Sequence, residues 1–178
     1  MKRILNYAAI IAIVALAACA AHAQPSPKDE AKVVVGGKTI SVNYSAPSVR
    51  GRKIFGDDGL ISGDPHYPVW RAGANDATAL HTDADLTIGI LKVPAGDYTI
   101  FVSVKDPNAW ELIVSKDTKE WGLAYKDNMD LGRVKMTMSK PAALVERLKY
   151  DLNSSGAGKA KLTLSWENHT ASVAMTVK

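Results

Sequence analysis

Residues 32–44 read KVVVGGKTISVNY, and this stretch indicates the fold class of the chain. Two β-branched runs flank Gly36-Gly37, and a glycine pair in that setting is typical of a tight hairpin turn whose central residues adopt positive φ. From Ile40 to Tyr44 every second residue is apolar. Alternation with a period of two predicts a strand with one buried face. The stretch therefore predicts a β-hairpin with strands over 32–35 and 39–44.

Similar short segments, separated by turn residues such as Pro94-Ala95-Gly96, continue to the C-terminus. We expect strands over residues 78–82, 86–93, 98–104, 110–115, 131–139, 145–152, 161–167 and 172–177. A helical turn is an alternative for 141–151, because proline is tolerated in the first turn of a helix. About nine or ten short strands predict an all-β fold: an antiparallel two-sheet sandwich, jelly-roll-like, forming a single domain over 32–178.

The first residues indicate export. A basic start, an apolar stretch over 4–18 and Ala21-His22-Ala23 predict a signal peptide over residues 1–23, since the apolar stretch is short for a membrane span. The alternative is a lipoprotein signal over 1–18, in which Cys19 would be lipidated. Either leader predicts a protein of the periplasm or cell envelope, secreted or lipid-anchored, with a polar linker over 24–31.

Charge is nearly balanced once the leader is removed. The chain has 22 basic and 18 acidic residues, and loss of Lys2 and Arg3 leaves 20 against 18, a net charge of +2. A nucleic-acid-binding protein would show a strongly basic stretch, so we expect no nucleic-acid partner. The partners we expect are a small molecule or an envelope component.

Standard catalytic signatures are absent from the sequence. It has neither a G-x-S-x-G nor an S-x-x-K motif. His66, His81 and His169 lie in separate segments without the spacing of metal ligands, so neither a metal nor a cofactor is expected. Two carboxyl groups suffice for glycoside hydrolysis. Loop acids therefore keep open the alternative of a saccharide hydrolase, with Asp57, Asp58 and Asp64 as the candidates.

Residues 45–76 form the segment with the most functional content. The segment is long, rich in Gly and Pro, and holds apolar anchors, so we expect an ordered excursion across the domain surface. Guanidinium groups bind carboxylate or phosphate and stack on aromatic rings. A second, turn-rich stretch around residues 121–125 could present an aromatic platform. The candidate binding residues are Arg50, Arg52, Lys53, Trp70, Arg71, Asn75, Trp121 and Tyr125.

Two interpretations of the arginine-bearing segment stay open. In the first, its side chains form a surface for a small anionic or carbohydrate ligand. In the second, Arg and Asn side chains donate to loop carbonyls and only stabilise the loop, since buried backbone groups must be paired. The tryptophans in predicted strands, Trp110 and Trp166, are expected in the core.

In these same segments the chain resembles a bacterial secreted family known as domain of unknown function 2911. The matching motifs are Tyr44-Ser45-x-Pro47, Gly51 to Gly56, Trp70 to Asn75, Val93 to Phe101, Trp110, Trp121-Gly122 and Tyr125. The resemblance covers most of the chain from about residue 32 to 167. It implies an exported, single-domain, β-rich protein, and it supplies no substrate, catalytic residue or cofactor.

Taken together, the sequence predicts a non-enzymatic envelope protein. We expect a binding or structural β-sandwich whose Arg/Trp loop takes a small anionic or carbohydrate ligand or an envelope partner.

Overall fold

The computed structural model describes residues 25–118 and 124–178. The predicted signal peptide, the candidate lipidation residue Cys19 and the candidate binding residue Trp121 lie outside the described residues. Within the described ranges, no helix is long and apolar enough to cross a membrane.

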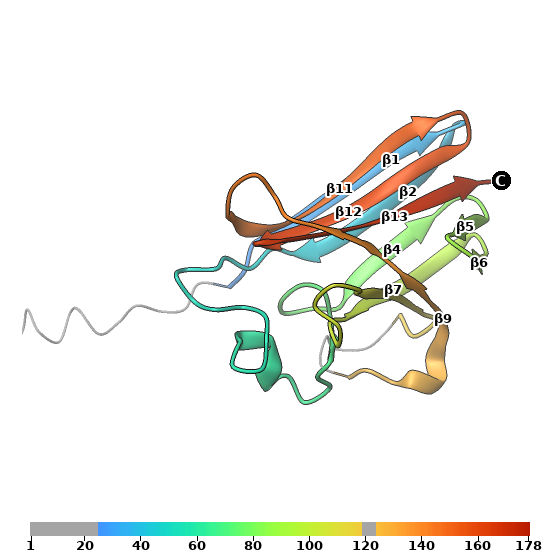
Figure 1. Ribbon diagram of the computed structural model, residues 1–178. Coiled ribbons are helices and arrows are strands. Elements are labelled where there is room, and N and C mark those ends of the chain that lie inside the picture. Colours follow the sequence, from blue (N-terminus) through green and yellow to red (C-terminus); the bar gives the residue numbers. More distant parts are fainter. Residues whose placement is uncertain (1–24, 119–123) are drawn as a thin grey trace, which may run out of the picture.

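Strands are the main regular elements of the described residues (Figure 1). They are β1 (Lys28–Val35), β2 (Lys38–Ser45), β3 (Val69–Trp70), β4 (Thr78–Thr82), β5 (Leu86–Ile88), β6 (Leu91–Val93), β7 (Gly96–Ser103), β8 (Glu111–Ser115), β9 (Asp130–Lys135), β10 (Thr137–Ser139), β11 (Val145–Gly156), β12 (Lys159–Glu167) and β13 (His169–Val177). Two 3-10 helices, η1 (Leu60–Gly63) and η2 (Asp127–Met129), lie in the connections.

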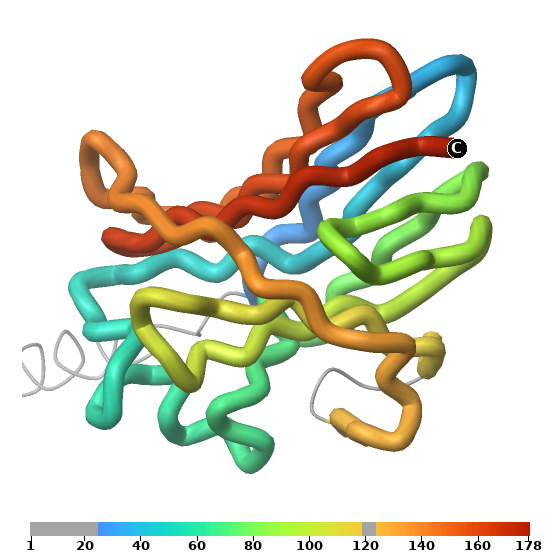
Figure 2. Tube along the Cα trace, turned by 45° about the vertical axis from the view of Figure 1, so that its right-hand side comes forward, coloured from blue at the N-terminus to red at the C-terminus, as the bar shows by residue number. Residues whose placement is uncertain are grey.

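The strands form two antiparallel sheets that stack on each other, which confirms the predicted sandwich (Figures 1 and 2). The first sheet has the order β1-β2-β4-β7-β8-β9, with β3 paired to β7. The second has the order β11-β12-β13-β5-β6, with β10 paired to β13. The β1–β2 hairpin turns at Gly36-Gly37, where both residues have positive φ, as the glycine pair predicts.

The core lies between the sheets because alternate side chains of each strand point inward. In β12 the inward set is Ala160, Leu162, Leu164 and Trp166, each buried between exposed or half-buried neighbours. The prediction that the strand tryptophans belong to the core is confirmed, since Trp110 and Trp166 are both 2% exposed.

A smaller apolar cluster lies apart from this core. It consists of Val69, Phe101 and Ile113, which alternate along their strands with residues of the main core. Tyr125 covers it, with its ring centroid 4.9 Å from that of Phe101. Because neighbouring residues of a strand point to opposite faces, this cluster lies on the outer face of the first sheet.

Strand boundaries differ from the sequence predictions in several places. The predicted strand over 131–139 is divided into β9 and β10, which belong to different sheets. β1 begins at Lys28, within the predicted linker, because backbone pairing with β2 extends to Lys28 and Ser45 despite charged side chains. The predicted strand over 86–93 is a hairpin instead, with Gly89 at φ +57° and Ile90 92% exposed in its turn. The apolar Ile90 hides that turn in the sequence pattern.

Two further differences concern the long loop and the C-terminal half. Within the loop, β3 pairs with β7, a two-residue strand that is too short to show periodicity. β11 continues to Gly156, beyond the predicted end at residue 152, through its pairing with β12. The helical alternative for 141–151 is wrong, because residues from Val145 onward pair as a strand.

Residues 46–77, between β2 and β4, lie at the end of the sandwich opposite the β1–β2 turn (Figure 1). Their ordered course agrees with the predicted excursion. Backbone amides of Leu60 and Ile61 donate to the carbonyls of Lys53 and Ile54, at 3.0 and 3.1 Å. Gly59 allows the backbone to approach residue 54 closely, because a Cβ at this position would lie 2.5 Å from the Ile54 carbonyl oxygen.

Candidate functional site

The loop encloses one side of a cavity of about 450 Å³, which we call the Arg71 cavity. This volume lies within the range of small-molecule sites. Its walls come from the loop, from η1, from the end of β3 and from β12. The lining residues are Pro47, Leu60, Ile61, Gly63, Asp64, Pro65, Trp70, Arg71, Gly73, Ala74 and Trp166.

Stacked aromatic rings form one wall of the cavity. Trp70 and Trp166 stack with centroids 5.6 Å apart and an interplanar angle of 19°. Phe55 packs edge-on against both, at 5.7 and 5.8 Å. Trp70 is 3% exposed, so other protein atoms cover both faces of its ring. A sugar could therefore not stack on either indole, although the sequence had suggested a carbohydrate ligand as one alternative.

Two buried hydrogen-bond donors, on residues that line the Arg71 cavity, have no partner within the described part of the chain. They are Nε of Arg71 and the indole Nε1 of Trp166. A buried donor left unpaired costs about 1–3 kcal/mol, so an acceptor supplied from outside the protein would be favourable here. Both groups donate and neither accepts. The arrangement suits a ligand that brings acceptor oxygens, such as a carboxylate.

The loop also places an acidic residue in the cavity. Asp64 is half-buried, and its Oδ1 accepts the backbone N–H of His66 at 2.9 Å. No ion pair joins Asp64 to Arg71, although both line the same cavity. The remaining wall is apolar, and its residue Leu60 is 48% exposed at the surface.

The other basic candidates are exposed on the same segment and do not line the cavity. Arg52 donates from Nε to the Val49 carbonyl at 3.0 Å and from Nη2 to the Ser48 carbonyl at 2.6 Å. Lys53 forms an ion pair with Asp58. Arg50 donates its backbone N–H to Glu146 at 2.9 Å. The contacts of Arg52 are those of a side chain that stabilises its own loop.

The remaining candidates lie elsewhere. Asn75 donates from Nδ2 to the Ser26 carbonyl at 3.2 Å. Tyr125 lies on the outer face of the first sheet, where its hydroxyl donates to Asp130 at 2.7 Å and accepts from Arg133. Burial and the Asp130 carboxylate raise the pKa of Tyr125. The structure therefore brings together only Trp70 and Arg71 of the described candidates, and adds Trp166, which sequence reasoning had assigned to the core alone.

The acids considered for hydrolysis are not gathered into one cavity. Asp57 lines a separate cavity of about 320 Å³ beside Trp110, whereas Asp64 lines the Arg71 cavity. Asp58 is engaged by Lys53. Among the described residues, no group of three or more His, Cys, Asp or Glu is arranged to hold a metal ion.

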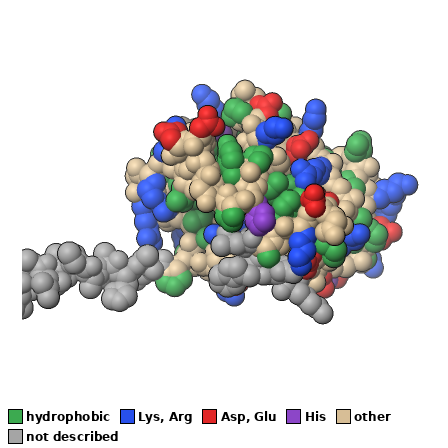
Figure 3. All heavy atoms as spheres, turned by 90° about the horizontal axis from the view of Figure 1, so that it is seen from below, with side chains coloured by type: hydrophobic (Ala, Val, Ile, Leu, Met, Phe, Trp, Pro, Cys, Tyr) green, Lys and Arg blue, Asp and Glu red, His purple; other side chains and the backbone are tan. Residues whose placement is uncertain are grey.

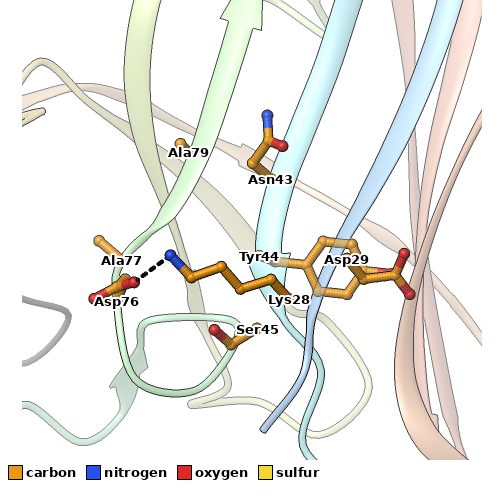
Figure 4. A pocket seen from close by; sticks show the side chains of 8 residues that line it. All are labelled: Lys28, Asp29, Asn43, Tyr44, Ser45, Asp76, Ala77 and Ala79. Atoms are coloured by element: carbon orange, nitrogen blue, oxygen red, sulfur yellow. Dashed lines mark ion pairs between the residues drawn. The ribbon is translucent and has the colours of Figure 1, made fainter.

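A groove of about 170 Å³ between β1, β2 and β4 is a weaker candidate (Figure 4). Its lysine already pairs within the protein, because Lys28 Nζ lies 3.2 Å from Asp76 Oδ2. Tyr44 contributes a buried ring that packs against Tyr150 at 4.8 Å. The groove therefore presents no unpaired charge from its lysine to a ligand.

His169 connects the loop to the β12–β13 turn next to the aromatic wall. Its ring stacks on Trp110 at 5.4 Å and contacts Phe55 at 4.7 Å. Its Nδ1 lies 3.3 Å from Glu167 Oε2, at ion-pair distance but outside hydrogen-bond geometry. The other Glu167 oxygen accepts the Ile54 N–H at 3.0 Å. Burial lowers the pKa of His169, against the opposing effect of Glu167.

This lowered pKa predicts a pH dependence of stability. The folded state disfavours protonated His169, so the unfolded state binds more protons below the ordinary histidine pKa of about 6.5. Unfolding free energy should fall as pH drops from about 7.5 to about 5.5. We expect the drop to be smaller in His169→Gln, measured by urea denaturation at each pH. If the unfolding free energy changed equally with pH in the two proteins, His169 would not be the source of the pH dependence.

Comparison with known proteins gives one match. The family model described as "Protein of unknown function (DUF2911)" matches residues 26–175, nearly the whole of the described chain. No curated protein and no solved structure matches this chain.

Proposed function

The chain belongs to the DUF2911 family of proteins of unknown function, and from that premise we propose that its sandwich domain is a binding module. Its ligand is a small anion, held in the Arg71 cavity without chemical conversion. The domain acts by presenting donors in a cavity with a mostly apolar lining. A charge-assisted hydrogen bond is about twice as strong as a neutral one.

One observation carries this proposal: Arg71 and Trp166, whose side chains each hold a buried donor without a partner in the protein, line a single cavity. The two residues come from segments far apart in the sequence, and the fold brings both to this cavity. A guanidinium offers a planar fork that matches the two oxygens of a carboxylate. A carboxylate would give both donors acceptors at once.

The surface around the loop supports a small ligand over a large partner. The view from below shows hydrophobic side chains near the middle of this face, surrounded by both basic and acidic side chains (Figure 3). Such a mixed surface lacks the broad single-sign field that steers a highly charged macromolecule.

A thermal-shift screen tests the proposal. A compound present at about 100 times its Kd stabilises a native protein by about 2.7 kcal/mol, which is on the order of 5–10 °C for a domain of this size. We expect carboxylates to raise Tm more than glucose does at matched ionic strength. The proposal would be overturned if no carboxylate, phosphate or sulfate raised Tm in the millimolar range.

We also propose that the protein acts after export, with cleavage after Ala23, or with Cys19 lipidated in the alternative form. This rests on the basic, apolar and small-residue order of the first 23 residues. Mass spectrometry of the chain expressed in a bacterium distinguishes the two, because lipidation would leave acylated Cys19 as the N-terminus. An intact Met1 on protein in the cytoplasmic fraction would contradict both.

A further inference from the structure

The lining of the Arg71 cavity has one basic and one acidic residue, and the two do not form an ion pair. Of its eleven lining residues only Arg71 and Asp64 are of charged types, and no ion pair joins them. Neither side chain has an ion-pair partner among the described residues, so each is available to a third group. A ligand that complements the site would carry both an anionic and a cationic or donor group.

Asp64 retains acceptor capacity for such a group. An ionised carboxylate has about four lone-pair sites, and Oδ1 uses one of them for the His66 N–H. The neighbouring walls favour an apolar ligand body between the two charged ends. They include Pro47 and Ile61, both buried, and Leu60 at the exposed rim.

The aromatic wall argues against a sugar as the ligand. Because Trp70 and Trp166 stack on each other and on the edge of Phe55, neither presents a free face of the kind that sugars use. The lining thus contains one basic residue, one acidic residue and aliphatic residues.

We propose that the ligand of this cavity is zwitterionic: an α-amino acid or short peptide with an apolar side chain. Its carboxylate lies at Arg71 and Trp166, its ammonium group at Asp64, and its side chain against Leu60 and Ile61. This inference rests on the proposed function and narrows it, because that function requires only the anionic group.

Three matched probes test it by isothermal titration calorimetry on the mature protein. L-leucine carries both charges, N-acetyl-L-leucine keeps the carboxylate alone, and 3-methylbutylamine keeps the ammonium alone. We expect leucine to bind about tenfold or more tightly than N-acetyl-leucine, and the amine to give no measurable heat. Glucuronate serves as a fourth probe, an anion without an ammonium group.

Two variants locate the effect. Asp64→Asn keeps an oxygen acceptor for the His66 N–H but loses the charge. We expect it to weaken leucine binding by about tenfold and to leave N-acetyl-leucine unchanged. Asp57→Asn is the matched control, because Asp57 lines a different cavity, and it should not affect leucine binding.

The outcomes separate the two proposals. If N-acetyl-leucine or glucuronate binds as tightly as leucine, and Asp64→Asn changes nothing, the ligand is a simple anion: the zwitterion proposal is wrong and the proposed function stands. If none of the four probes binds and no inorganic anion stabilises the protein, both proposals are wrong.

Discussion

Replacing Phe55 by alanine is expected to destabilise the domain by about 3–5 kcal/mol, the usual cost of removing a large buried aromatic ring. Phe55 is 8% exposed, and its ring packs against those of Trp70, Trp110, Trp166 and His169 at centroid distances of 4.7 to 5.8 Å. No other side chain fills that position, so the substitution leaves a cavity among the four rings. Urea denaturation of the mature domain measures the loss.

Leu60→Ala is the matched control for Phe55. Leu60 lies in the same loop but is 48% exposed, so its truncation should cost about 1 kcal/mol or less. A loss below about 1 kcal/mol for Phe55→Ala would show that the loop is not anchored through this ring. The aromatic wall of the Arg71 cavity would then need another support.

Arg71→Ala is expected to weaken carboxylate binding by about ten- to a hundredfold while changing the unfolding free energy by less than about 1 kcal/mol. The two effects diverge because Nε of Arg71 has no partner in the protein. Truncation removes an unpaired buried donor, so little native bonding is lost. Calorimetry with L-leucine measures binding, and urea denaturation measures stability.

Arg52→Ala is the control for a basic residue of the same segment. Its guanidinium is occupied by the carbonyls of Ser48 and Val49, so its loss should cost some stability and leave binding unchanged. The opposite result, with Arg71→Ala strongly destabilised and still binding, would assign Arg71 to loop support and move the ligand site elsewhere.

The fold could be predicted from sequence because most strands carry their own signal. The β1–β2 hairpin is marked by Gly36-Gly37, and β12 by the inward series that ends at Trp166. Local periodicity gave no sign of β3, because two residues complete no period and Val69–Trp70 pair only through the distant β7. The 86–93 segment misled because an exposed Ile90 extends its apolar run through a turn.

The candidate site was only partly predictable, for a different reason. Arg52 and Arg71 are equivalent in sequence terms, both basic and both in one glycine-rich loop. Only the fold distinguishes a guanidinium bonded to loop carbonyls from one that is left unpaired. Likewise, a strand tryptophan such as Trp166 is assigned to the core by default, and its unpaired Nε1 depends on contacts between distant segments.

The indole N–H of Trp166 offers the most direct test of the binding account. The chain has four tryptophans, so their ¹H–¹⁵N indole signals can be resolved and assigned with Trp166→Phe. Titration with L-leucine should shift the Trp166 signal with the same saturation curve that calorimetry gives, and Arg71→Ala should abolish the shift. A Trp166 signal that stays fixed while leucine binds would contradict the assignment of the ligand to the Arg71 cavity.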